Sequence, residues 1–339
     1  METEKKNSSK KVWITNLRAI ACMMVIMIHV IAGWLDNTGI VLTGARNVLD
    51  NIILQPLIRW AVPVFIMISG CLLLNPKKDM SIKKILKYIK KMLIILLIFG
   101  FTYCFIECIF DYGFNNLWKN IYMSLFNLIQ GKSWGVMWYI YMLIGLYIVT
   151  PILRQFIKYS SDKEIKIVTI LLTIFSILIP SINFILKINI TSFYLQGFEY
   201  ITLYLLGYIL AFKLNQRHVK YVYLGGVVGF AGNLILLIFK LPFEQLNFFE
   251  VLIAMSIFTY FSQKQNIKES KFLTKISNDS LGIYLIHTFW LNLINKGFNI
   301  YPSVLPIAVG EIIFFIIALT LSVLSVEIMK RIPYLKKII

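Results

Sequence analysis

Residues 13–30 read WITNLRAIACMMVIMIHV and place two ionisable side chains, Arg18 and His29, inside an apolar stretch long enough to cross a membrane. An arginine near the centre of a bilayer costs roughly 2.5–3.5 kcal/mol on insertion scales, so such groups usually face the interior of a helix bundle. Eleven residues separate Arg18 from His29. At about 100° per residue, both side chains lie on one face of a helix, roughly 16 Å apart along its axis. We therefore predict that this helix carries a functional face.

The composition indicates a multi-span membrane protein. Of the 339 residues, 58% are hydrophobic and 15% are charged, which leaves too little polar surface for a soluble globule. A net charge of +18 would suggest nucleic-acid binding in a soluble protein, but these basic residues lie in the gaps between apolar runs, so we expect no nucleic acid. The four cysteines all lie within apolar runs, and we expect neither disulfides nor a metal site.

The predicted fold is an all-α transmembrane bundle of about ten spans, forming a single domain over residues 1–339 with a cytoplasmic tail at 1–11. A span needs about 20 apolar residues. The segment Asn116–Ile129 is amphipathic and is predicted to lie along the membrane surface. The expected spans are 12–34, 52–74, 90–110, 134–157, 165–183, 193–213, 219–239, 247–262, 278–299 and 303–329.

The distribution of basic residues predicts the orientation of these spans. Of the 34 Lys and Arg residues, 26 fall in the N-terminal tail, the C-terminal tail and every second gap between them. Because cytoplasmic loops carry the excess of Lys and Arg, both termini are predicted to be cytoplasmic. Arg18 then lies in the cytoplasmic half of the first span and His29 near its outer end.

The same orientation gathers polar side chains in the outer half of the membrane, where we predict one hydrated acceptor cavity. Two of these side chains, Trp138 and Tyr139, also fit the aromatic belt that membrane proteins place at an interface. The predicted cavity residues are Arg59, Glu107, Trp138, Tyr139, Glu199, Glu250 and His287.

His29 is the candidate general base, because a neutral imidazole suits proton abstraction near pH 7. A nearby Glu is expected to orient its second ring nitrogen. A purely structural His29, bonded to a helix carbonyl, is the alternative. His287 fits either a structural or a functional role, in a helix that we expect Ser277 or Asn278 to cap.

The basic stretch 77–91, KKDMSIKKILKYIKK, has two interpretations. It fits the ordinary excess of positive charge on the cytoplasmic side and attraction to anionic membrane lipid. It also fits a landing site for a phosphate-bearing cytosolic donor, in which Lys83, Lys84 and Lys87 bind as point charges beside Arg18.

Several stretches together resemble the acyltransferase-3 family of multi-span membrane O-acyltransferases. Arg18 and His29 resemble its Arg-x10-His signature, and Arg59–Leu74, RWAVPVFIMISGCLLL, resembles the pattern of its second span. Residues 138–154 and Ser280–His287, SLGIYLIH, are similar to the branch that includes enterobacterial-antigen acetyltransferases and the membrane halves of vancomycin-resistance racemases.

This resemblance implies transfer of an acyl group, commonly acetyl from acetyl-CoA as co-substrate with no permanently bound cofactor, to a hydroxyl of a cell-envelope glycan. It implies a bacterial plasma-membrane protein, with His29 as base and Arg18 in the donor site. The chain departs from the Arg-x-x-Arg motif that members often carry after the second span, since only lysines stand there. Many members add an extracytoplasmic domain, so we expect direct transfer here or a separate extracytoplasmic partner, and a homodimer is also open.

Two other functions remain as alternatives. A transporter that exports a surface polysaccharide or takes up an amino acid would also use a charged outer cavity, although no inverted repeat is evident. A membrane scaffold would explain the spans but not the intramembrane Arg18 and His29.

Overall fold

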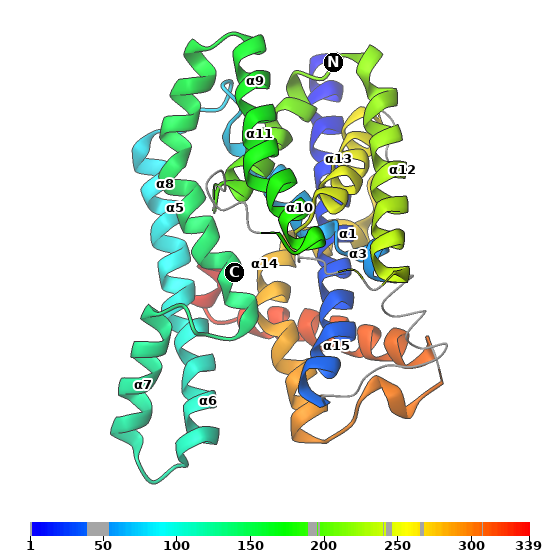
Figure 1. The fold of residues 1–339 in the computed structure, drawn as a ribbon. Helices are drawn as coiled ribbons and strands as arrows, with labels where there is room; N and C mark the ends of the chain where they lie inside the picture. Colours follow the sequence, from blue (N-terminus) through cyan, green and yellow to red (C-terminus); the bar gives the residue numbers. More distant parts are fainter. Residues whose placement is uncertain are drawn as a thin grey trace. The chain divides into compact units, whose positions relative to one another are not determined.

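The structure is a computed structural model, and the described part of the chain consists of helices and the loops between them (Figure 1). It covers residues 2–38, 54–188, 195, 197–239, 241, 246–264, 268–306 and 308–339, with only the backbone considered at 2–11 and 33–38. Contacts divide the chain into a first unit, Met1–Asn75 and Ser160–Glu327, and a second unit, Pro76–Tyr159 and Ile328–Ile339. No strand occurs in the described ranges, which confirms the predicted all-α class.

The first unit contains most of the helices. They are α1 (Glu2–Thr38), α3 (Gln55–Ile58), α4 (Ala61–Leu73), α9 (Asp162–Thr173), α10 (Ile179–Leu186), α11 (Phe198–Phe212), α12 (Gln216–Ile238), α13 (Phe248–Gln263), α14 (Lys271–Asn292) and α15 (Val309–Met329). The second unit contains α5 (Ile82–Ile95), α6 (Phe101–Tyr112), α7 (Leu117–Ile129) and α8 (Trp138–Tyr159). The predicted surface helix at 116–129 is therefore a helix, and the side chain of Asn116 caps it by accepting from the Lys119 amide.

Many of these helices are suited to a membrane. By length and apolar composition, seven helical stretches of the described chain are able to cross one, and the apolar helices α11 and α13 are shorter. The predicted ninth span is helical as α14 but is not among the seven. The seven stretches are 12–32, 55–73, 82–112, 135–159, 162–186, 216–238 and 309–329.

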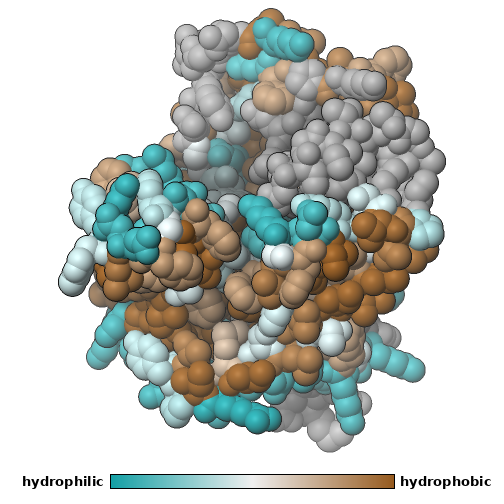
Figure 2. Space-filling model, turned by 90° about the horizontal axis from the view of Figure 1, so that it is seen from below, coloured by the Kyte–Doolittle hydropathy of each residue, from teal (hydrophilic) through white to brown (hydrophobic). Residues whose placement is uncertain are grey.

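Apolar side chains also cover much of the outside of the molecule. On α12, the side chain of Leu224 is 59% exposed and that of Val227 is 66% exposed. Figure 2 shows broad hydrophobic areas on the face seen from below, interrupted by hydrophilic patches. An outer surface of this kind suits lipid rather than water as its solvent.

The start of α14 differs from the expectation. The prediction that Ser277 or Asn278 caps a helix beginning near 278 is wrong, because α14 begins at Lys271 and the side chain of Ser270 caps it by accepting from the Leu273 amide. Ser277 and Asp279 instead lie buried inside the helix. A polar cluster that looks like a cap is thus part of a packed helix face.

The centre of the first unit is a close crossing of α4 and α11. A Cβ atom at Gly70 would overlap the backbone carbonyl of Tyr204, and one at Gly207 would overlap that of Met67. Glycine is therefore required on both helices for their backbones to touch, as at other close helix contacts in membranes.

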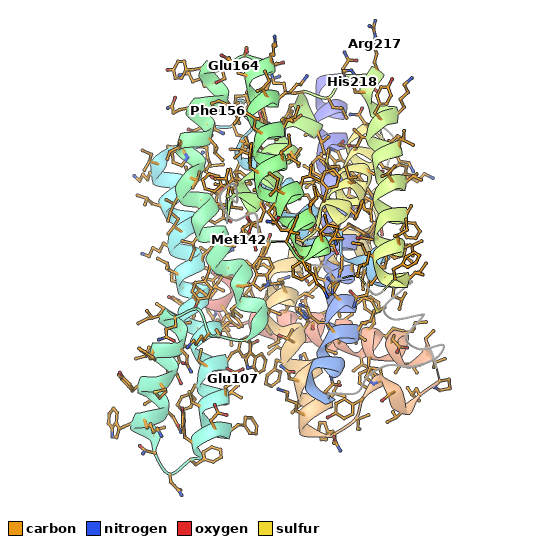
Figure 3. The ribbon with its side chains drawn as sticks, viewed as in Figure 1. Glu107, Met142, Phe156, Glu164, Arg217 and His218 are labelled. Carbon is orange, nitrogen blue, oxygen red and sulfur yellow. The ribbon has the colours of Figure 1, made fainter. Side chains whose placement is uncertain are left out.

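One end of the first unit carries polar contacts. Asp162 at the start of α9 pairs with Lys213 just after α11, 2.6 Å apart. The hydrogen bond to Asp162 raises the pKa of Lys213. Figure 3 shows Glu164, Arg217 and His218 at this same end, where α1 also begins. In the sequence, these segments belong to the gaps predicted to be cytoplasmic.

Candidate functional site

Helices α1 and α14 lie side by side and run in the same direction. The Cys22 thiol lies 3.9 Å from the Ser280 carbonyl, within its hydrogen-bonding range, and seven residues later in both helices the ring of His29 meets that of His287. At the other end, the Asn16 amide donates to the carbonyl of Lys268, just before α14. Residue numbers therefore rise together along the contact, so His29 and His287 lie at the same level along the two helices.

The orientation of His287 is fixed by its own helix. Its Nδ1 lies 2.8 Å from the carbonyl oxygen of Tyr284 and 3.2 Å from that of Ile283. A carbonyl oxygen only accepts, so this network assigns the proton of the neutral ring to Nδ1. The other nitrogen, Nε2, is then a lone-pair acceptor. It is buried and has no hydrogen-bond partner among the described residues.

His29 is the more accessible member of the pair. Its side chain is partly exposed, whereas His287 is 0% exposed. The two ring centroids are 5.1 Å apart and the planes are tilted by 49°. Because α1 is one continuous helix through both positions, Arg18 and His29 share a face as predicted. The contact therefore joins a partly exposed imidazole to a fully buried one.

Arg59 and Glu250 form a second pair in the first unit. Arg59 Nη1 lies 3.9 Å from Glu250 Oε1, and the carboxylate side chain is only 1% exposed. Asn247 caps α13 by accepting from the Glu250 amide, which places the carboxylate in the first turn, where the helix dipole favours negative charge. Both residues were predicted for the acceptor cavity, and the structure brings these two together.

The remaining predicted cavity residues are Glu199 in the first unit and Glu107, Trp138 and Tyr139 in the second unit. Glu199 lies in the first turn of α11. Glu107 lies on α6 in the second unit (Figure 3), as do Trp138 and Tyr139, whose rings meet edge to face at 5.9 Å. A single cavity containing all of them therefore stays a prediction.

The basic stretch belongs to the second unit. Lys83, Lys84 and Lys87 are exposed on α5, which begins eight residues before the predicted span. Lys84 pairs with Asp79 at 2.9 Å, and this hydrogen bond holds the pKa of Asp79 below its ordinary value. Lys84 is thus already engaged by a carboxylate of its own loop.

Arg154 contacts the basic stretch at 77–91, and the sequence did not predict this contact. From α8, its Nη2 donates to the carbonyl of Lys78 at 2.7 Å. The two positions are 76 residues apart, and α5, which follows Lys78, packs against α8. No sequence pattern signalled this contact.

Asp279 and Asn247 were also missed as site residues. Asp279 is 2% exposed beside Cys22, on the α14 face that packs against α1. Asn247 directly precedes an apolar run with Glu three residues later, a capping signal that would have identified it.

The described residues contain no group of three or more His, Cys, Asp or Glu side chains placed to hold a metal ion. None of the four cysteines forms a disulfide, and all four are buried. Cys108 accepts a hydrogen bond from the Asn127 side chain at 3.9 Å, which fits a packing role.

A family model described as an acyltransferase domain matches residues 11–327 of the chain. No curated protein and no solved structure matches it. The matched range begins within α1, contains α3 to α14 and ends near the end of α15, and so includes His29, His287, Arg59 and Glu250.

Proposed function

Because the chain belongs to the acyltransferase-3 family, whose model spans residues 11–327, we propose that it is a membrane O-acyltransferase with His29 as its general base. The proposed donor is acetyl-CoA or another acyl-CoA in the cytosol. The proposed acceptor is a hydroxyl of a cell-envelope glycan, as in the branch of envelope acetyltransferases that the sequence resembles.

The observation that carries this proposal is the contact between His29 and His287. Ionisable side chains inside membrane helices are rare, face the bundle interior and commonly mark proton or substrate paths. Here two imidazoles from helices 258 residues apart meet, and His29 keeps a partly exposed side. An accessible imidazole supported by a second polar group is the arrangement that general-base catalysis needs.

The proposed reaction has two steps, addition to the thioester and release of CoA. His29 takes the proton of the acceptor hydroxyl while the hydroxyl oxygen bonds to the thioester carbonyl carbon. The tetrahedral intermediate then releases CoA as its thiolate, which takes the proton back from His29 to leave as the thiol. The product is an ester, and His29 returns to its neutral form.

In the proposed topology, ten spans cross a bacterial plasma membrane and both termini are cytoplasmic. The orientation rests on the positive-inside bias of 26 among 34 basic residues. Acyl-CoA then approaches from the side of Arg18, Lys83 and Lys87, and the acceptor reaches His29 from outside. Arg59, Glu250 and Glu199 are the proposed acceptor contacts within the first unit.

Purified protein in liposomes tests the activity directly. With radiolabelled acetyl-CoA and envelope glycan from the source cells, we expect CoA thiol release together with label that becomes bound to the glycan as an ester. Protein that moves labelled polysaccharide or amino acid across the liposome membrane without acyl-CoA, and releases no thiol in its presence, would instead be a transporter.

A further inference from the structure

We propose that His287 is a positioning residue that holds His29 in one tautomer, the role for which a Glu was expected. This inference rests on the proposed function, because it assigns His287 a part in the same proton transfer. The hydrogen bond it requires runs from an N–H of His29 to Nε2 of His287.

His287 is suited to accept such a bond because it is locked in place. The Tyr284 and Ile283 carbonyls both accept a hydrogen bond from its Nδ1–H, at 2.8 and 3.2 Å, which leaves Nε2 as the only acceptor on the ring. The ring is 0% exposed, so bulk water does not reach Nε2. A buried acceptor without a partner is costly, by about 1–3 kcal/mol, and His29 is the ring beside it.

The separation of the rings fits a direct hydrogen bond. An imidazole nitrogen lies roughly 1.2 Å from its ring centroid, so a bond of about 2.9 Å between two rings places their centroids about 5 Å apart. The observed distance is 5.1 Å. The planes are tilted by 49° and Nε2 has no hydrogen-bond partner in this orientation, so the proposed bond requires a rotation of His29 about its terminal side-chain torsion, which is broad for histidine.

This bond decides which nitrogen of His29 is the base. When one nitrogen donates to His287, the other carries the lone pair and is directed to the partly exposed side, where the acceptor hydroxyl arrives. After proton transfer, the imidazolium of His29 keeps the same bond, and His287 stays neutral with its one proton on Nδ1, where it donates to the two carbonyls. The proton therefore stays on His29 until the leaving thiolate takes it.

A structural His287 would make the same bonds to Ile283 and Tyr284 and affect only stability. Two variants separate the roles. His287→Phe keeps the ring shape and removes the acceptor, whereas His287→Gln places an amide oxygen near the position of Nε2. Thr288→Val is the matched control, since Thr288 is a neighbouring buried side chain on α14 whose hydroxyl has no hydrogen-bond partner among the described residues.

Kinetics with acetyl-CoA and envelope glycan give the first measurement. We expect kcat to fall by about 10²-fold in His287→Phe with little change in KM for acetyl-CoA, partial recovery in His287→Gln, and wild-type rates in Thr288→Val. Equal rates in His287→Phe and Thr288→Val would overturn the positioning role.

Nitrogen NMR of His29 in protein labelled at histidine gives the second measurement, and it does not depend on any activity. We expect one neutral tautomer in the wild type and a mixture of two in His287→Phe. A mixture already in the wild type, or the same single tautomer in both proteins, would overturn the inference. Absence of acyl transfer in the wild type would instead contradict the proposed function and leave the NMR result to decide the role of His287.

Discussion

At the scale of single residues, Arg59 and Glu250 form an ion pair in which each charged group compensates the other for lost contact with water. The carboxylate is 1% exposed and the guanidinium side chain 18% exposed, so neither is well solvated without its partner. Removing one member of a buried pair leaves an uncompensated charge, whereas removing both is often tolerated.

We predict that Arg59→Met destabilises the protein by about 3 kcal/mol, measured by thermal or denaturant unfolding in detergent. The double variant Arg59→Met with Glu250→Gln should recover much of this loss. Arg217→Met is the matched control, because Arg217 is exposed at the start of α12. If Arg59→Met were as stable as that control, the pair would contribute nothing to the fold.

In the candidate site, the sequence could predict which residues share a face of one helix, but not which residues of different helices meet. The shared face of Arg18 and His29 follows from their spacing on one helix. The partner of His29 does not, because it comes from α14 and no local pattern specifies which helices pack together. For the same reason, Arg59 and Glu250 were each predicted, but their pairing was not.

At the scale of elements, the crossing of α4 and α11 depends on two glycines. A side chain at Gly70 or Gly207 would meet the backbone of the other helix, which cannot rotate away as a side chain can. The requirement is therefore steric and independent of polarity.

Gly70→Ala and Gly207→Ala are each predicted to lower stability by about 1–3 kcal/mol or more, because the added methyl forces the helices apart. Gly145→Ala on α8 is the control, since its Cβ would meet open space and alanine favours a helix by roughly 1 kcal/mol. The measurement is the unfolding midpoint of each of the three variants, which should be lower for Gly70→Ala and Gly207→Ala than for Gly145→Ala. Equal midpoints would show that the helices do not touch at these glycines.

Helix existence was easier to predict than helix boundaries. The apolar runs gave the right helices, because burial in lipid favours long apolar segments. The starts of α5 and α14 were placed too late, since their first turns carry lysines that a hydropathy pattern assigns to loops. A helix continues past the apolar boundary when its backbone bonds are satisfied, as the Ser270 cap of α14 allows.

At the scale of the whole molecule, the proposed topology fixes which loops face each side of the membrane. Neighbouring segments agree with an alternating path, because α1 and α14 run in the same direction and the start of α9 meets the end of α11. The composition predicted an all-helical membrane chain. It did not predict the two compact units, because which helices contact each other is set by side-chain packing that hydropathy does not encode.

Cysteine labelling tests the topology against a low background, since the four native cysteines are buried. In intact cells, a membrane-impermeant maleimide should label Ser303→Cys and should label Lys163→Cys only after permeabilisation. Both positions are exposed in the structure. Labelling of both from the same side would contradict the ten-span path.

The central claim is that His29 is the general base of an acyl transfer, and one rate comparison tests it. Purified wild type, His29→Ala and His218→Ala are given acetyl-CoA and envelope glycan, and ester formation is followed. His218 is the control because it is an exposed histidine on α12. We predict that His29→Ala loses at least about 10²-fold in kcat at unchanged folded yield, while His218→Ala keeps the wild-type rate. Wild-type ester formation by His29→Ala would contradict the account.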